Sequence, residues 1–288
     1  SSPGVVLKVQ RPASLCDSTA SIMASGSAEV QGHRGFGDDA PHNTLVAFRA
    51  AGELPGLTSV EFDVRRSADG YLIVTHGPEI GPNLGKATLA ELREAGVPLL
   101  SEVVDCCLKG NLSMNVELKG GESADNVADT LALLREKGAL PSCRISSFDR
   151  GMLKQTMEIE PRVPLGALYH PAERLVDPND PSKGIIYEEE PEDFASWFED
   201  HRIDGDSVNL RAEAVLRKPE LIEHARKCGK QVMVWFPCNT NNGFEDGEAT
   251  YRRILDLGVE VICCNKPSVL TSLLSKGQEQ PAKKAKTS

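Results

Sequence analysis

The chain has 288 residues, of which 40% are hydrophobic and 26% are charged, and its formal net charge at pH 7 is −10. These values are typical of a soluble globular protein with room for one barrel-sized domain. The acidic balance argues against an extended nucleic-acid-binding surface, which needs a basic face. No apolar run approaches the length of about 20 residues that a membrane span requires.

The first 27 residues are rich in Ser and Ala and lack the basic-then-apolar pattern of a secretory signal. We interpret residues 1–27 as a flexible extension, with a remnant of a targeting sequence as the alternative. The eight cysteines of the chain include no Cys-x-x-Cys motif. Their pattern favours a reducing compartment, here the cytoplasm, over a secreted protein held by disulfides.

Strand-like and helix-like stretches alternate after this extension. Eight strands are expected, at Ala28–Gln31, Ser59–Val64, Leu112–Leu118, Arg144–Ser147, Val163–Tyr169, Asp206–Leu210, Gln231–Trp235 and Val259–Cys263. Helices are expected at Thr44–Ala51, Leu100–Leu108, Ala124–Lys137, Arg150–Ile159, Pro191–Asp200, Pro219–Cys228, Gly247–Leu257 and Ser268–Leu274. Repeated β-then-α order predicts a parallel sheet. Eight such units favour a single-domain (β/α)8 TIM barrel over residues 28–275, with a doubly wound sheet as the alternative.

Two segments fall outside the alternation. A short strand is expected at Tyr71–Thr75, where the turn Ala68-Asp69-Gly70 would pair it with the second strand as a hairpin. It begins a compact insertion after strand two. The polar tail, residues 276–288, contains the basic run Lys283-Lys284-Ala285-Lys286, which is more typical of a solvated tail than of a nuclear-import signal.

Polar side chains gather at the expected ends of the first strands, where barrel enzymes place their chemistry. The segments are Gly32-His33-Arg34-Gly35, Glu61-Phe62-Asp63, His76 and Glu117-Leu118-Lys119. Residues two apart on a strand share a face, so Glu61 and Asp63 point the same way. Phe62 and Leu118 would point outward against the helices. Two carboxylates on one face repel each other unless a cation lies between them.

Together these segments supply three carboxylates, two histidines and two cations. Hard oxygen ligands favour Mg²⁺ or Ca²⁺ over zinc. A divalent cation, Arg34 and Lys119 can hold a phosphoryl group, and two histidines can divide general acid and base roles near neutral pH. Taken singly, the same residues are typical of structural histidines, solvated strand faces or an ion pair. Their coincidence at consecutive strand ends predicts phosphodiester cleavage.

A longer series of motifs contains these residues. It comprises Gly32-His33-Arg34-Gly35, Ala40-Pro41-His42-Asn43-Thr44, Phe48, Val60-Glu61-Phe62-Asp63-Val64, Asp69-Gly70, Thr75-His76, Val116-Glu117-Leu118-Lys119 and Ile145-Ser146-Ser147-Phe148-Asp149. Weaker echoes follow at Val234-Trp235, Gly258-Val259 and Lys266-Pro267. In this series the chain resembles the glycerophosphodiester phosphodiesterases, roughly from Ala28 to Leu274.

The resemblance implies a barrel enzyme that hydrolyses glycerophosphodiesters to glycerol phosphate and an alcohol with a bound Mg²⁺ or Ca²⁺. It implies a role for each residue of the strand-end set. The metal ligands would be Glu61, Asp63 and Glu117, the acid/base pair His33 and His76, and the phosphate-binding residues Arg34 and Lys119. The resemblance also makes Asn43 the expected N-cap of the first helix, and it leaves Trp235 facing either the organic group of the substrate or the core.

The chain departs from the family pattern at several positions. His42 stands where Glu is common, Gly77 replaces the Asp after the second His, Asn265 replaces the Asp before Pro267, and Phe236-Pro237 replaces Thr-Val. Gly at position 77 is shared with phospholipase D toxins. A lysophospholipase D acting on lysolipids is therefore an alternative, as is a non-catalytic barrel that binds metal or phosphodiester.

The segment between His76 and Glu117 is short for the family that the chain resembles, which implies a wide mouth over the site. Trp235, Phe236 and Phe244 would then supply an apolar rim for bulky diesters. The expected partners are accordingly a small glycerophosphodiester or a lysophospholipid.

Overall fold

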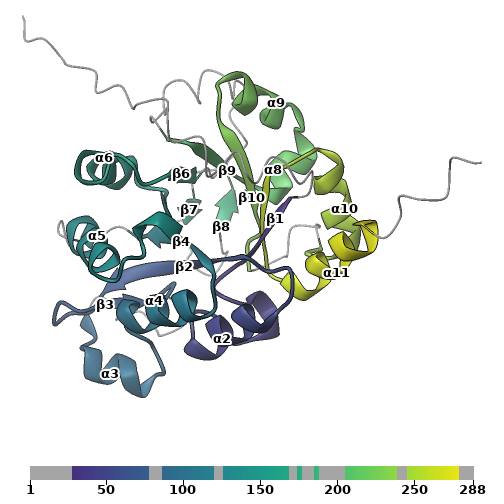
Figure 1. Ribbon diagram of the computed structural model, residues 1–288. Coiled ribbons are helices and arrows are strands. Elements are labelled where there is room, and N and C mark those ends of the chain that lie inside the picture. The colour runs from purple at the N-terminus through teal and green to yellow at the C-terminus, as the bar shows by residue number, and fades with distance from the viewer. Residues whose placement is uncertain are drawn as a thin grey trace, which may run out of the picture.

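The computed structural model describes residues 28–77, 86–119, 126–168, 174–176, 185–187, 205–238 and 245–278. Within these ranges eight parallel strands close into a barrel with helices on its outside (Figure 1). The barrel strands are β1 (Glu29–Gly32), β2 (Ser59–Arg66), β4 (Ser113–Leu118), β5 (Cys143–Ser147), β6 (Leu165–Leu168), β9 (Ser207–Arg211), β10 (Gln231–Trp235) and β11 (Val261–Cys264). The eight expected strands and the barrel are confirmed, and the doubly wound alternative is wrong.

The barrel closes where β1 lies between β11 and the first residues of β2. Gly32 is opposite Cys264 on one side and Val60 on the other. Farther along, β2 pairs instead with the antiparallel strand β3 (Leu72–Val74), with Val64 opposite Val74. The expected hairpin is thus confirmed, and the carboxyl-terminal half of β2 is left free of β1 for the loop that follows His33.

The helices match the expected pattern where the structure describes them. They are α2 (Leu45–Glu53), α4 (Leu100–Lys109), α5 (Asn126–Glu136), α6 (Arg150–Ile159), α9 (Glu220–Lys227), α10 (Glu248–Asp256) and α11 (Pro267–Gln278). The expected helix Pro191–Asp200 lies outside the described residues. The last helix, α11, extends past residue 275, where we placed the end of the barrel domain.

Several short elements add to this pattern. They are the helices α3 (Leu89–Glu94) and α8 (Ala212–Arg217), the 3-10 turns η2 (Gly37–Asp39) and η5 (Leu140–Ser142), and the antiparallel pair β7 (Arg174–Val176) and β8 (Ile185–Tyr187). A capping box formed by Thr88 and Glu91 starts α3 inside the insertion after β2. In the part of the chain that the structure describes, no helix is long and apolar enough to cross a membrane.

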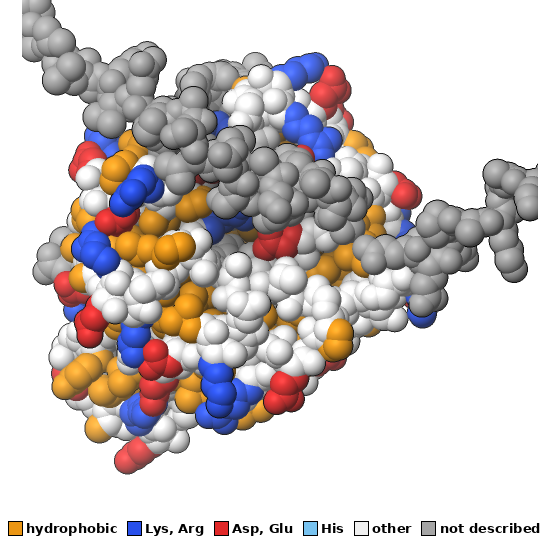
Figure 2. Space-filling view, in the orientation of Figure 1, with side chains coloured by type: hydrophobic (Ala, Val, Ile, Leu, Met, Phe, Trp, Pro, Cys, Tyr) orange, Lys and Arg blue, Asp and Glu red, His pale blue; other side chains and the backbone are white. Residues whose placement is uncertain are grey.

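The barrel strands present different chemistry on their two faces. The outward face is apolar: Phe62 packs edge-on against Phe48 of α2, with ring centroids 5.6 Å apart, and both side chains are fully buried. Inside the barrel polar and apolar side chains mix. The Asn115 amide donates to Gln31 over 3.0 Å and lies 3.8 Å from the sulfur of Met233, which clusters with Val261 and Cys263. On the face seen in Figure 2, the described acidic and basic side chains are interspersed and form no extended basic surface.

The outward layer should supply most of the stability. We expect Phe62→Ala to lower the free energy of unfolding by about 3–5 kcal/mol, because it removes a fully buried ring and leaves a cavity against α2. Val46→Ala on the same helix, where Val46 is 59% exposed, should change it by less than about 0.5 kcal/mol. Equilibrium denaturation of both variants measures the difference. Similar losses for the two would contradict this account of the core.

Candidate active site

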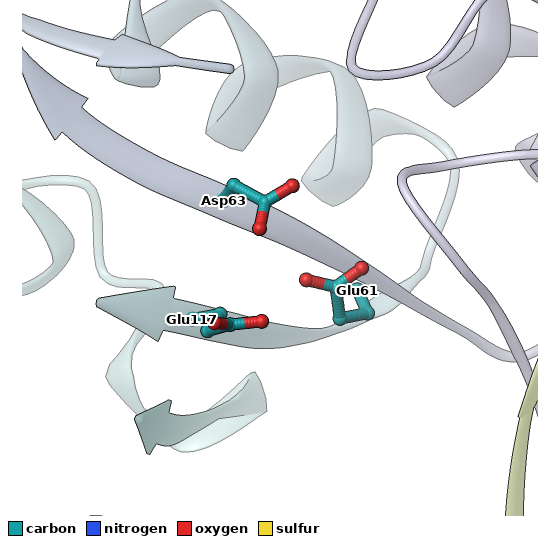
Figure 3. A group of neighbouring side chains, drawn as sticks. All are labelled: Glu61, Asp63 and Glu117. Atoms are coloured by element: carbon teal, nitrogen blue, oxygen red, sulfur yellow. The ribbon is translucent and has the colours of Figure 1, made fainter. Parts of the chain in front are cut away.

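Three buried carboxylates lie together on two neighbouring strands, two of them within β2 and one next to the end of β4. Glu61 and Asp63 come from β2 and Glu117 from β4, and each offers an oxygen within 4.8 Å of the others (Figure 3). The register sets this proximity, because Asp63 is directly opposite Glu117. The intervening Phe62 and Leu118 face the outer core, as expected. The alternation of the strand therefore places every second residue into the cluster.

Two cations partly neutralise the cluster. The Lys119 ammonium lies 2.9 Å from Asp63 Oδ1 and also contacts Glu117. The Arg34 guanidinium is 3.6 Å from Asp63 Oδ2, and the Arg34 backbone N–H donates to Glu61 Oε2 over 2.9 Å. Arg34 has a left-handed backbone with φ of 54°, which turns its amide toward β2. The two cations therefore balance two of the three negative charges.

The pKa values of Asp63 and Glu61 are shifted in opposite directions. Burial alone would raise the pKa of Asp63, but Lys119 and Arg34 outweigh it and hold that pKa well below its usual range. For Glu61, burial and the neighbouring Asp63 and Glu117 raise the pKa well above the ordinary value. The Oε1 atom of Glu61 is buried and accepts no hydrogen bond from the described residues. An oxygen-only set with one unsatisfied, charge-strained carboxylate fits a divalent cation.

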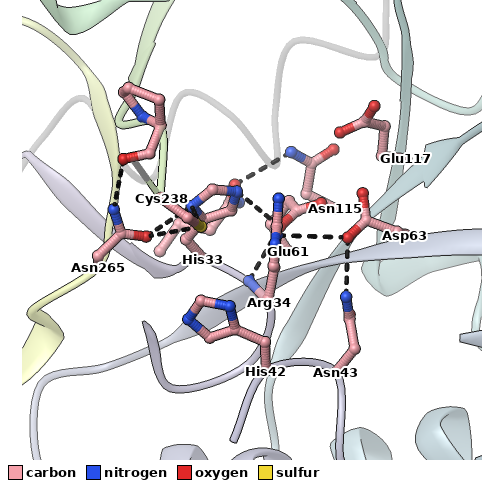
Figure 4. A network of polar contacts seen from close by, with 12 residues as sticks. His33, Arg34, His42, Asn43, Glu61, Asp63, Asn115, Glu117, Cys238 and Asn265 are labelled. Carbon is pink, nitrogen blue, oxygen red and sulfur yellow. Dashed lines mark hydrogen bonds and ion pairs between the residues drawn. The ribbon is translucent and has the colours of Figure 1, made fainter. Parts of the chain in front are cut away.

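His33 lies beside the cluster on the loop after β1 (Figure 4). Its Nε2 is 3.7 Å from Glu61 Oε2, and its Nδ1 is 2.6 Å from Asn265 Oδ1 at the end of β11. The thiol of Cys238 lies 3.5 Å from the same Nδ1. Burial, assisted by the nearby Arg34, lowers the pKa of His33 to about 3. The imidazole is therefore neutral at neutral pH, with Nε2 directed at the carboxylates.

His76 follows β3 and is brought to the same end of the barrel. Burial raises the pKa of Asp63, and His76 adds to the effect of Lys119 and Arg34 that lowers it. The His76 backbone carbonyl accepts from Arg65 Nε over 2.9 Å. The residue after it, Gly77, has φ of 127°, a conformation that favours glycine. The glycine at position 77 therefore permits the backbone turn that follows β3.

Asn43 binds the cluster and does not cap a helix. The N-cap of α2 is Thr44, whose hydroxyl accepts from the Ala47 amide, so the expected N-cap at Asn43 is wrong. Asn43 adopts a left-handed backbone with φ of 56°. This conformation lets its side-chain amide donate to Asp63 Oδ2 over 2.8 Å. The hydrogen bond from Asn43 to buried Asp63 thus takes the place of a cap at Asn43, and Thr44 caps the helix instead.

Trp235 ends β10 at the same end of the barrel. Its ring is 5.9 Å from the ring of Phe148, and the Arg211 guanidinium lies 6.0 Å from its centroid. Phe148 is 42% exposed, and the Lys119 ammonium is 5.9 Å from its ring. Among the described residues, Phe148 is thus the aromatic side chain near Lys119, and Trp235 is the one near Arg211.

The expected apolar rim is partly wrong. Phe236 is buried and packs edge-on against Tyr251, with centroids 5.4 Å apart, so it belongs to the core. Phe244 lies outside the described residues. The sequence pattern assigned no role to Asn265, which contacts His33, or to Arg211, which is paired with buried Glu213 and lies 6.0 Å from the Trp235 ring. Asn265 carried a signal, because it is a polar residue at the end of the last strand and departs from the family pattern.

The comparisons with known proteins identify the family of the chain. The profile described as "Glycerophosphoryl diester phosphodiesterase family" matches residues 33–269. The chain is 27% identical over 269 residues to the glycerophosphodiester phosphodiesterase of Caldanaerobacter subterraneus, covering 86% of this chain and 98% of that protein. It is 30% identical over 109 residues to human glycerophosphodiester phosphodiesterase 1, covering 31% of this chain and 33% of that protein.

Solved structures share the fold. The glycerophosphodiester phosphodiesterase of Thermotoga maritima aligns with a TM-score of 0.61 at 25% identity, covering 85% of this chain and 98% of that chain. A phosphodiesterase of Oleispira antarctica, solved with its product sn-glycerol-3-phosphate, aligns with a TM-score of 0.66 at 19% identity, covering 88% and 98%.

The raised pKa of Glu61 should lower the stability of the metal-free protein at neutral pH. A carboxyl whose pKa is raised by folding costs stability at every pH above its ordinary value, near 4.5. With EDTA at pH 7, Glu61→Gln should therefore melt higher than the wild type, by roughly 2–4 °C for each kcal/mol relieved. The gain should fade as the pH approaches the ordinary value, because Glu61 is then protonated in both states.

Exposed Glu158 provides the control, since Glu158→Gln should leave the melting temperature nearly unchanged under the same conditions. Saturating Mg²⁺ or Ca²⁺ should reverse the order of wild type and Glu61→Gln. A variant that melts at or below the wild type in EDTA at pH 7 would show that Glu61 is not under charge strain.

Proposed function

The chain belongs to the glycerophosphoryl diester phosphodiesterase family and is a hydrolase of glycerophosphodiesters, and we propose that it cleaves them with a divalent cation and a pair of histidines. The observation that carries the proposal is the buried carboxylate cluster with the Nε2 atom of His33 directed at it. We further propose that the barrel domain, residues 28–275, holds the whole site, and that residues 1–27 and 276–288 take no part in it.

Glu61, Asp63 and Glu117 would hold the cation, which fits either Mg²⁺ or Ca²⁺. When bound, it supplies positive charge for the phosphoryl oxygens. Arg34 and Lys119 contribute fixed cationic groups beside the same oxygens, and their contacts with Asp63 keep them in place before substrate arrives. Trp235 and Phe148 would border the organic group of the leaving alcohol.

The two histidines would divide the proton transfers. His33 is neutral at neutral pH, so its Nε2 can take a proton from an attacking water. His76 would give a proton to the oxygen of the leaving alcohol. Such a division needs one imidazole that starts unprotonated, which burial beside Arg34 provides for His33.

A panel of substrates tests the reaction and its metal requirement together. Glycerophosphocholine, glycerophosphoethanolamine, glycerophosphoinositol and lysophosphatidylcholine below its micellar concentration should be assayed for both glycerol phosphate and free alcohol. We expect glycerol phosphate from at least one diester, loss of activity after chelation, and recovery with Mg²⁺ or Ca²⁺. Glu61→Ala should lose metal-dependent stabilisation while it keeps the fold.

Two results of the panel would contradict the proposal. Full activity after exhaustive chelation would remove the cation from the mechanism. Absence of turnover on every diester, with the metal bound, would favour a non-catalytic barrel. Preference for lysophosphatidylcholine would identify a lysophospholipase D, which the exposed ring of Phe148 next to Lys119 would help to explain.

Both histidines should be needed for turnover. We expect His33→Ala and His76→Ala each to lower kcat by about 10²-fold or more, the usual scale for loss of a general acid or base. Circular dichroism should be unchanged, because both side chains lie at strand ends outside the apolar core. His224→Ala on α9 is the matched control and should keep wild-type kcat. Near wild-type turnover of His76→Ala would exclude that residue from the mechanism.

A further inference from the structure

We propose that Asn265 is a positioning residue that fixes a proton on Nδ1 of His33 and so leaves Nε2 unprotonated toward the carboxylates. The inference rests on the proposed function, because it assigns His33 its starting tautomer for proton abstraction. It concerns a residue at the end of β11, in the last repeat of the barrel, far along the chain from the His33 segment.

The orientation of the Asn265 amide follows from its two contacts. Its Nδ2 lies 3.0 Å from the carbonyl oxygen of Pro237, and its Oδ1 lies 2.6 Å from Nδ1 of His33. A backbone carbonyl can only accept a hydrogen bond, so the amide must direct its NH₂ group to Pro237. The opposite orientation would place two oxygens 3.0 Å apart. The oxygen of the amide therefore faces His33.

The tautomer of His33 follows from this orientation. An amide oxygen can only accept, so the short contact requires a proton on Nδ1. A neutral imidazole carries only one such proton, which leaves a lone pair on Nε2. That atom is 3.7 Å from Glu61 Oε2 and faces the carboxylate cluster. The ring is thus held as a base with its accepting nitrogen toward the reacting groups.

Asn265 is itself held from several sides. Its backbone N–H donates to Asp246 Oδ2 over 3.0 Å, and its carbonyl accepts from the Asp38 amide over 2.7 Å. Asp246 also accepts from the Tyr251 hydroxyl. Gly37 presses so closely that a Cβ there would lie 2.1 Å from the Asn265 carbonyl oxygen. The backbone of Asn265 therefore cannot shift without moving the loop that carries His33.

These contacts demand an amide at this position. One end of the side chain must accept from His33 and the other must donate to Pro237. A carboxylate would keep the first interaction but would oppose the Pro237 carbonyl with a second oxygen. Leucine has nearly the same shape and offers neither interaction. The two substitutions therefore separate the role toward His33 from the role in holding the loop.

Kinetics of these variants test the inference with glycerophosphocholine and saturating Mg²⁺. Asn265→Leu should lower kcat by about 10- to 100-fold, the scale for loss of a supporting partner, and leave KM within about 3-fold. Asn265→Asp should retain a larger kcat than Asn265→Leu, because it keeps an acceptor for Nδ1, yet it should also melt below wild type. Thr156→Val removes a buried hydrogen bond on α6, away from the site, and should leave kcat unchanged.

Combination with His33→Ala shows whether Asn265 acts through the imidazole. Without the ring, adding Asn265→Leu should change the residual kcat by less than about 2-fold. A further loss comparable to that in the wild-type background would overturn the inference. So would an Asn265→Leu variant with wild-type kcat, or an Asn265→Asp variant no more active than Asn265→Leu.

Nitrogen-15 NMR of the ¹⁵N-histidine-labelled protein tests the tautomer without any assay of activity, with His33→Ala used to assign the signals. We expect His33 to be protonated at Nδ1 and unprotonated at Nε2 at pH 7, and Asn265→Leu to shift it toward a mixture of tautomers. Protonation at Nε2 in the wild type would reject the inference and leave the proposed function standing. Loss of the proposed function itself would instead appear as an active His33→Ala variant.

Discussion

Mutual repulsion among three buried carboxylates is the constraint to which the rest of the site responds. Glu61, Asp63 and Glu117 share a small space away from water, an arrangement that costs stability unless positive charge or hydrogen-bond donors surround it. Lys119 supplies charge from the residue after β4. The donor amide of Asn43 approaches from the start of α2. The pKa of Glu61 is still raised by burial and by its two neighbours, as expected for a carboxylate whose compensating charge would be a bound cation.

The way the barrel closes leaves space for the contacts that compensate these negative charges. Because β1 pairs with only the first residues of β2, the chain after Gly32 can fold back over the open edge. Gly35 donates its N–H to the Glu61 carbonyl over 3.0 Å, which fastens this loop to β2. The left-handed backbone at Arg34 turns its amide to the Glu61 side chain. Barrel closure and charge compensation thus depend on the same few residues.

The sequence predicted what depends on periodicity and failed where contacts come from distant parts of the chain. Alternation along β2 and β4 was enough to place Phe62 outside and the carboxylates inside. Asn43 satisfied the local rule for a helix cap, yet its amide is used by Asp63, which no local pattern could show. Phe236 follows a strand and could have faced solvent, but Tyr251 of α10 covers it. To predict such contacts, one must know which helix covers which strand end.

Asn265 illustrates how an amide suits a position beside a buried carboxylate cluster. A carboxylate beside His33 would add a fourth negative charge near Glu61, whose ionised form burial and two neighbours already disfavour. An amide accepts from the same imidazole without that charge, and the Pro237 carbonyl gives its other end a partner. The contact with Nδ1 of His33 is thereby made without a further negative charge. Hydrogen-bond geometry, and not charge, is therefore what Asn265 supplies to His33.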